Sequence, residues 1–102
     1  MDYQVVWSPK ALDDIDAIAA YIARDSVSYA AAVVQRIIEA TRKLNDNPLS
    51  GNVVQEFGDE TIRELFAYTY RILYQIKDET VTVAAIVHAK QLLKLYPSRI
   101  DE

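Results

Sequence analysis

The segment from Tyr70 to Ile76 constrains the fold strongly, because as a strand it is apolar on both faces. One face carries two tyrosines and two isoleucines, namely Tyr70, Ile72, Tyr74 and Ile76. The other face carries Leu73 between Arg71 and Gln75. Such a strand belongs in the middle of a sheet, where a guanidinium needs a partner because an unpaired buried charge is costly. We therefore expect Arg71 either to pair with Glu64 on the preceding strand or to bind an anion.

Further strands are predicted on both sides of this segment. Alternating apolar residues indicate one strand over Ile62–Ala67 and another over Thr80–His88, with the central strand extending over Tyr70–Lys77. Asp78-Glu79 forms a tight hairpin before the last strand. Near the start of the chain, aromatic and β-branched residues predict a short strand over Tyr3–Trp7. The stretch 49–58 lacks a clear period, so we expect it to be irregular.

Two amphipathic helices are predicted between the first strand and these later strands. Ser8-Pro9 begins the first helix as N-cap and first helical residue, and apolar residues at helical spacing extend it to Arg24. Ser26 or Ser28 caps the second helix, which ends at the turn-forming sequence Asn45-Asp46-Asn47-Pro48. Because the connection is short, the two helices form an antiparallel hairpin.

Together these elements predict a single α+β domain over residues 1–102. Their order is β-α-α-β-β-β, and the helical hairpin covers one face of an antiparallel sheet. The other face then presents Arg71. Residues 94–102 form a tail for which we expect either a short helix or a flexible segment.

Composition narrows the class of function. The chain contains no cysteine, which excludes disulfides and thiolate metal sites. With one histidine and scattered carboxylates, we expect no bound metal and no cofactor. A net charge of −4 argues against a general nucleic-acid-binding protein. No apolar run is long enough to span a bilayer, and the start of the chain does not read as a signal peptide, so we expect a cytoplasmic protein.

Several polar and aromatic residues have both a structural and a functional interpretation. Three aspartates near the start of the first helix resemble a carboxylate cluster, but the helix dipole explains them: Asp13, Asp14 and Asp16. Three tyrosines of the strand region are interpreted as core or edge residues rather than base-stacking platforms: Tyr68, Tyr70 and Tyr74.

The histidine at the end of the last strand is the remaining residue of this kind. His88 shares strand parity with Ala84 and Ile86, which predicts that it lies on the less buried face together with Arg71. We interpret it as a cap that bonds the backbone at the strand end. Contact with a binding partner and general-base chemistry remain the alternatives.

Four short motifs occur in order along the chain. They are Trp7-Ser8-Pro9-Lys10-Ala11, Asn47-Pro48-Leu49-Ser50-Gly51, Arg63-Glu64-Leu65, and Tyr70-Arg71-Ile72-Leu73-Tyr74 leading to Ile86-Val87-His88. With the order of elements, these motifs resemble the RelE/ParE superfamily of toxins from type II toxin–antitoxin modules. The resemblance covers roughly residues 3–93 and implies a small toxin held inactive by a co-encoded antitoxin.

The superfamily that the chain resembles has two branches with different targets. ParE-like members poison DNA gyrase, whereas RelE-like members are ribosome-dependent endoribonucleases that use clustered cations with a C-terminal Tyr or His. By this resemblance, a nuclease set here comprises Arg63, Arg71, Lys90 and Tyr96 as phosphate clamp and acid/base groups. The set is incomplete, because Glu64 adds an anion beside Arg63 and Lys90 stands where an arginine is usual. The central-strand motif is more ParE-like.

The resemblance therefore predicts a ParE-like toxin of plasmid-stabilisation type that inhibits DNA gyrase and is neutralised by a ParD-like antitoxin in a hetero-oligomer. The alternatives are a RelE-like mRNA endoribonuclease acting at the ribosome, and a degenerate, non-toxic family member. An antitoxin is expected to place apolar anchors along the helical hairpin and acidic residues at a basic strand edge. The candidate residues for binding target or antitoxin are Arg63, Arg71, His88, Lys90, Val34 and Ile38.

Overall fold

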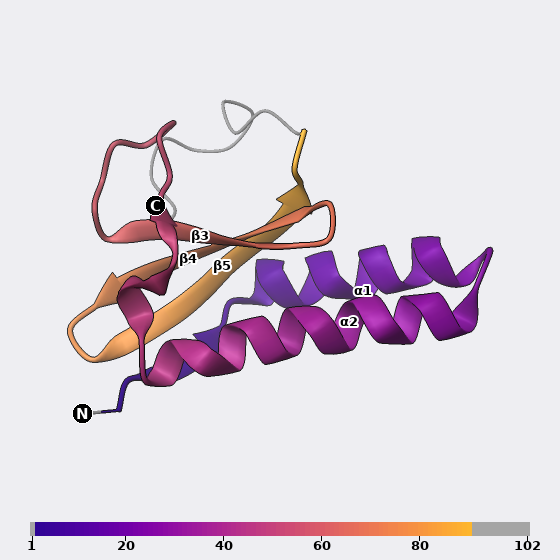
Figure 1. Cartoon of the computed structure of the whole chain (residues 1–102), viewed down its shortest axis with the longest axis horizontal. Helices are drawn as coiled ribbons and strands as arrows, with labels where there is room; N and C mark the ends of the chain where they lie inside the picture. The colour runs from indigo at the N-terminus through magenta and orange to yellow at the C-terminus, as the bar shows by residue number, and fades with distance from the viewer. Residues whose placement is uncertain (1, 91–102) are drawn as a thin grey trace.

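The computed structural model describes residues 2–90, which form a five-stranded sheet with a helical hairpin on one face (Figure 1). The elements are β1 (Gln4–Trp7), α1 (Pro9–Ala23), α2 (Val27–Arg42), the 3₁₀ turns η1 (Lys43–Asn45) and η2 (Pro48–Ser50), β2 (Asn52–Val53), β3 (Ile62–Ala67), β4 (Tyr70–Lys77) and β5 (Thr80–His88). The predicted α+β class is confirmed, as are the bounds of the three long strands. The predicted tail 94–102, with Tyr96, lies outside the described residues. Within 2–90, no helix has the length and apolar character needed to cross a bilayer.

The strand order across the sheet is β1-β5-β4-β3-β2, so β4 is central as predicted. It pairs antiparallel with both β3 and β5. Two details differ from the prediction of an irregular 49–58 stretch and an antiparallel sheet. The two-residue strand β2 pairs with β3, and β1 joins β5 in parallel. A two-residue strand is too short to show a period in the sequence, and the long connection from β1 to β5 permits a parallel pair.

Serine caps begin both helices. The Ser8 Oγ accepts a hydrogen bond from the Ala11 amide at 3.0 Å, with Pro9 at the first helical position. Ser26, rather than Ser28, caps α2 and accepts from the Tyr29 amide at 3.1 Å. The main core lies between the helices and the sheet and consists of Ala11, Ile15, Val33, Ile37, Ala67, Ile72, Val83 and Ile86.

A β-bulge interrupts the β4–β5 ladder. Leu73 pairs with Ala85 but the next residue, Tyr74, pairs with Val83, so Ala84 is the extra residue. The helix-facing side of β5 is therefore Val83 before the bulge and Ile86 after it.

Polar side chains of α1 and its cap satisfy the backbone of the bulge. The Ser8 hydroxyl donates to the Ala84 carbonyl, and the Ile86 amide donates to Asp14 Oδ2, both at 2.9 Å. Lys10 donates to the same carboxylate at 3.1 Å. This corrects the dipole interpretation of the aspartates, since α1 has no acidic residue in its first turn.

His88 and Arg71 lie on opposite faces of the sheet, so the prediction that they share a face is wrong. His88 pairs with Tyr70, and the two rings meet edge to face with centroids 5.9 Å apart. Arg71 pairs with Val87 instead. Neighbouring residues of a strand point to opposite faces, and the bulge breaks the single parity that the sequence argument assumed. The interpretation as a strand-end cap fits, because His88 Nδ1 accepts from the Lys90 amide at 3.2 Å.

Candidate functional site

The guanidinium of Arg71 lies on the face of the sheet away from the helices and is bound by two carboxylates. Its Nε and Nη2 are each 2.6 Å from Glu64 Oε1, which confirms the predicted pair. Its Nη1 and Nη2 donate to the two oxygens of Glu56 at 3.0 and 3.2 Å, a fork that the sequence argument missed. Only 9% of the Arg71 side chain is exposed, against 12% for Glu64 and 39% for Glu56.

The strand register and a small second core bring these three charges together. Glu64 on β3 pairs with Leu73, so it lies diagonally across from Arg71, within reach of two long side chains. Glu56 belongs to the segment between β2 and β3. Val54 and Phe57 on either side of it pack on the same sheet face, in a cluster with Leu73, Ile62, Ala85 and Val87. Burial of these apolar neighbours holds Glu56 over the guanidinium.

The electrostatics of this cluster are those of a saturated cation. The hydrogen bond to Glu56 is the main reason that the pKa of Arg71 is raised, and the same bond lowers the pKa of Glu56 below its usual range. One cation and two anions leave the cluster with a net charge of −1. It lines one side of an open depression of about 590 Å³ that also contacts Asn52, Val53, Gln55, Phe66 and Ala89. Arg71 is therefore paired within the chain, and its guanidinium is not free to bind an external anion.

The other cations proposed for a nuclease do not join Arg71 in this cluster. Arg63 pairs with Tyr74 and so points to the opposite face. There it donates from Nη1 to the Gly51 carbonyl at 2.9 Å and from Nε to the Glu60 carbonyl at 3.0 Å. Lys90 is exposed just after β5 and follows Ala89, which lines the depression. The structure thus separates Arg63 from Arg71, and Tyr96 is beyond the described residues.

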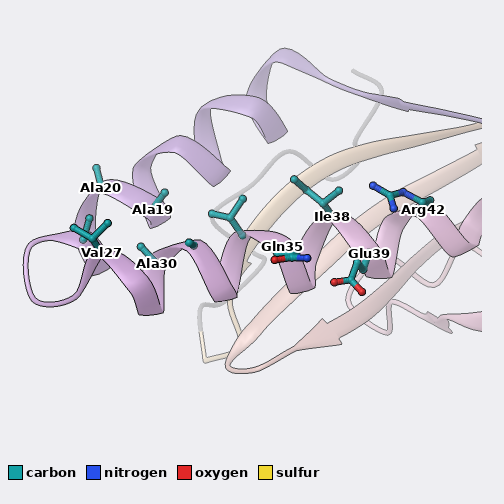
Figure 2. Close-up of a pocket in the computed structure, with 11 residues that line it drawn as sticks. Ala19, Ala20, Val27, Ala30, Gln35, Ile38, Glu39 and Arg42 are labelled. Carbon is teal, nitrogen blue, oxygen red and sulfur yellow. The ribbon is translucent and has the colours of Figure 1, made fainter.

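The helical hairpin carries a second candidate site, an apolar groove of about 850 Å³ between α1 and α2 (Figure 2). Both predicted anchors on α2 line it: Ile38 is 39% exposed and Val34 is half-buried. Small residues that were not predicted from the sequence complete the lining: Ala19, Ala20, Ala23, Ala30 and Ala31. The spacing of these alanines along both helices could have indicated the groove in the sequence, since small side chains let another backbone approach closely. Gln35, Glu39 and Arg42 add polar groups toward the end of α2 (Figure 2).

Several solved structures from toxin–antitoxin systems share this fold. A ParDE system chain from P. aeruginosa aligns with a TM-score of 0.70 at 21% identity, covering 86% of this chain and 97% of that one. A chain of the RelBE2 toxin–antitoxin complex from Mycobacterium tuberculosis aligns with a TM-score of 0.62 at 22% identity, covering 86% and 99%. A mutant of E. coli toxin RelE in the free state aligns with a TM-score of 0.63 at 18% identity, covering 88% and 86%. The fold is therefore that of the RelE/ParE toxins.

Sequence comparison gives the family. Residues 5–93 match the family described as the ParE toxin of the type II toxin–antitoxin system parDE. The chain belongs to this family, and it is a toxin of the ParE/RelE superfamily. It is also 34% identical over 90 residues to Toxin RelE2 of Caulobacter vibrioides, covering 87% of this chain and 98% of that protein.

Proposed function

We propose that this chain is a ParE-like toxin that inhibits DNA gyrase by binding it, without making or breaking a bond itself. The observation that carries the proposal is the double carboxylate pairing of Arg71. A nuclease must stabilise charge on the scissile phosphate with cations that are free to meet it. Here the central guanidinium is already neutralised, and Arg63 is engaged with backbone carbonyls on the other face.

We further propose that the antitoxin lays an amphipathic helix in the groove between α1 and α2. The alanine lining and the apolar side chains of Val34 and Ile38 fit the helix-in-groove mode of recognition. Substituting Ile38 with Asp places a charge in this groove while the core side chain of Ile37 next to it stays in place. The substitution should weaken antitoxin binding by at least about tenfold, in the range of interface hot spots.

A supercoiling assay tests the gyrase proposal directly. Purified chain is added to DNA gyrase and relaxed plasmid, and we expect loss of supercoiling that the co-encoded antitoxin reverses. The expressed chain should arrest growth over the same range of concentration. Growth arrest with unimpaired gyrase would contradict the proposal.

The RelE-like endoribonuclease is the second candidate, favoured by the 34% identity to Toxin RelE2. It predicts that expression cleaves messenger RNA at the ribosome and that an Arg71→Lys variant, which retains the charge but loses the fork, no longer does so. Primer extension on a reporter transcript distinguishes the two candidates. Intact transcripts during growth arrest would exclude the nuclease, and cleaved transcripts would exclude the gyrase proposal as the main activity. Harmless expression without the antitoxin would instead identify a degenerate, non-toxic member.

A further inference from the structure

Two tyrosines from different elements meet beside the β3–β4 turn. Tyr29 of α2 and Tyr68 of the turn lie edge to face, with ring centroids 6.0 Å apart. Arg36 of α2 lies over the Tyr68 ring. We call Tyr29, Tyr68 and Arg36 the tyrosine patch.

Much of this aromatic surface is open to solvent. Tyr29 and Tyr68 are each 50% exposed. Exposed aromatic clusters of this kind mark contact surfaces, since tyrosine and arginine are the residues that most often dominate interfaces.

Tyr68 has a left-handed backbone conformation with a φ of 56°, and Asp78 in the β4–β5 turn has the same φ. Tyr68 is the first residue of the two-residue turn between the paired residues Ala67 and Tyr70. Glycine takes this conformation without cost, whereas a bulky side chain there is strained. Strain of this kind concentrates at functional sites, where the side chain is retained for what it contacts.

Arg36 gives the patch its positive charge. Its guanidinium lies over the Tyr68 ring, 5.7 Å from the ring centroid. Across residues 2–90, Arg36 forms no salt bridge, in contrast to Arg71.

The patch faces away from the groove that we assign to the antitoxin. At about 100° per residue, Tyr29 lies roughly 140° around α2 from Val34, and Arg36 lies roughly 160° from Ile38. A helix seated in the groove therefore does not bury the patch directly.

We propose that the tyrosine patch is the surface that binds the toxin's protein target, and that it receives an acidic segment of that target. The inference rests on the proposed function for the identity of the target, DNA gyrase. A protein segment fits better than stacked nucleobases, because Arg36 already lies over the ring face of Tyr68. The ring edges, the phenol hydroxyls and the Arg36 guanidinium remain for contact, and these are complementary to carboxylates.

The decisive variant is Tyr68→Gly, which removes the ring while relieving the strained backbone. We expect its melting temperature to stay within a few degrees of wild type, because relief of strain offsets the lost ring contacts. Binding to purified gyrase, measured by biolayer interferometry with the full chain immobilised, should fall by about tenfold or more. Arg36→Glu should weaken gyrase binding at least as much, and it should remove most of the salt dependence of that binding.

Matched controls lie away from both the patch and the groove. Leu49→Ser changes an apolar side chain that is 63% exposed on η2, and Lys77→Glu reverses an exposed charge at the opposite end of β4. Both should bind gyrase as wild type does, and all four variants should bind the antitoxin normally. Gyrase binding by Tyr68→Gly and Arg36→Glu at wild-type strength overturns the patch and leaves the gyrase proposal standing.

Absence of gyrase binding in the wild type would overturn the proposed function and shift the test to growth. In that case, loss of growth arrest in folded, antitoxin-binding Tyr68→Gly supports the patch as the contact for another target. Arrest as strong as in wild type overturns the patch. A wild-type chain that neither binds gyrase nor slows growth overturns both proposals.

Discussion

Removal of the Arg71 side chain distinguishes a structural cation from a catalytic one. In Arg71→Met the aliphatic stem is retained, but Glu64 is left as an unpaired carboxylate that is only 12% exposed. Breaking a buried pair on one side costs about 3–5 kcal/mol. At about 4–8 °C per kcal/mol for a domain of this size, the melting temperature should drop by about 12–40 °C.

The double variant Arg71→Met/Glu64→Leu removes the guanidinium and its buried carboxylate partner, and leaves only Glu56, whose side chain is 39% exposed. It should recover most of this loss, because apolar replacements of a buried pair are often neutral or stabilising. Urea denaturation followed by circular dichroism measures both variants against wild type. If the single variant is as stable as wild type, or the double variant is no better than the single, the reasoning from desolvation is refuted. If the double variant folds and still arrests growth, Arg71 serves the fold. A folded double variant without toxicity would show that the guanidinium acts on the target.

Three further predictions concern the parts of the fold that support this site. Gly51→Ala should destabilise the chain by about 1–3 kcal/mol in urea denaturation, because an added Cβ would come within 2.6 Å of the Tyr74 hydroxyl; wild-type stability would contradict the packing of this turn. Asp14→Ala should cost about 1–3 kcal/mol by leaving the Ile86 amide of the bulge without its acceptor, and amide exchange at Ile86 should become faster. Since the folded pKa of Glu56 is depressed, its stabilising contribution is complete above its ordinary value of 4.5 and is lost as the pH falls through the lowered pKa. Glu56→Gln should therefore be less stable than wild type at pH 7 but nearly equal to it at strongly acid pH, and a difference that persists unchanged in acid would refute the ion pair as its origin.

The regular part of the fold could be predicted because local patterns and tertiary packing agree there. The apolar positions that define Tyr70–Lys77 as a central strand are the ones that the core and the second sheet face bury. The serine caps and the Asn45–Pro48 stop are likewise local signals, and they fix both ends of the helical hairpin. The ion pair between Arg71 and Glu64 could be predicted from the sequence, because the pairing of two neighbouring strands places these residues diagonally across from each other.

The details that sequence did not reveal are those fixed by long-range contacts. Glu56 reaches Arg71 because Val54 and Phe57 pack on the sheet. An irregular segment has no residue period, so this packing could not be predicted from the sequence. The bulge at Ala84 depends on partners from α1 far away in sequence. Because side chains alternate along a strand, one inserted residue was enough to misplace His88 relative to Arg71.

The two hydrogen bonds between Glu56 and Arg71 also weaken the binding of any external anion to Arg71. A phosphate that is to bind Arg71 must displace a carboxylate tethered in the same chain, and tethered groups compete at effective concentrations of about millimolar or above. It must also approach a cluster whose net charge is already −1. An RNA substrate could offset this only with several further cations on the same face, and Arg63 points to the other one. The same reasoning favours a target that is recognised elsewhere on the chain, such as the tyrosine patch, where the Arg36 guanidinium forms no salt bridge within residues 2–90.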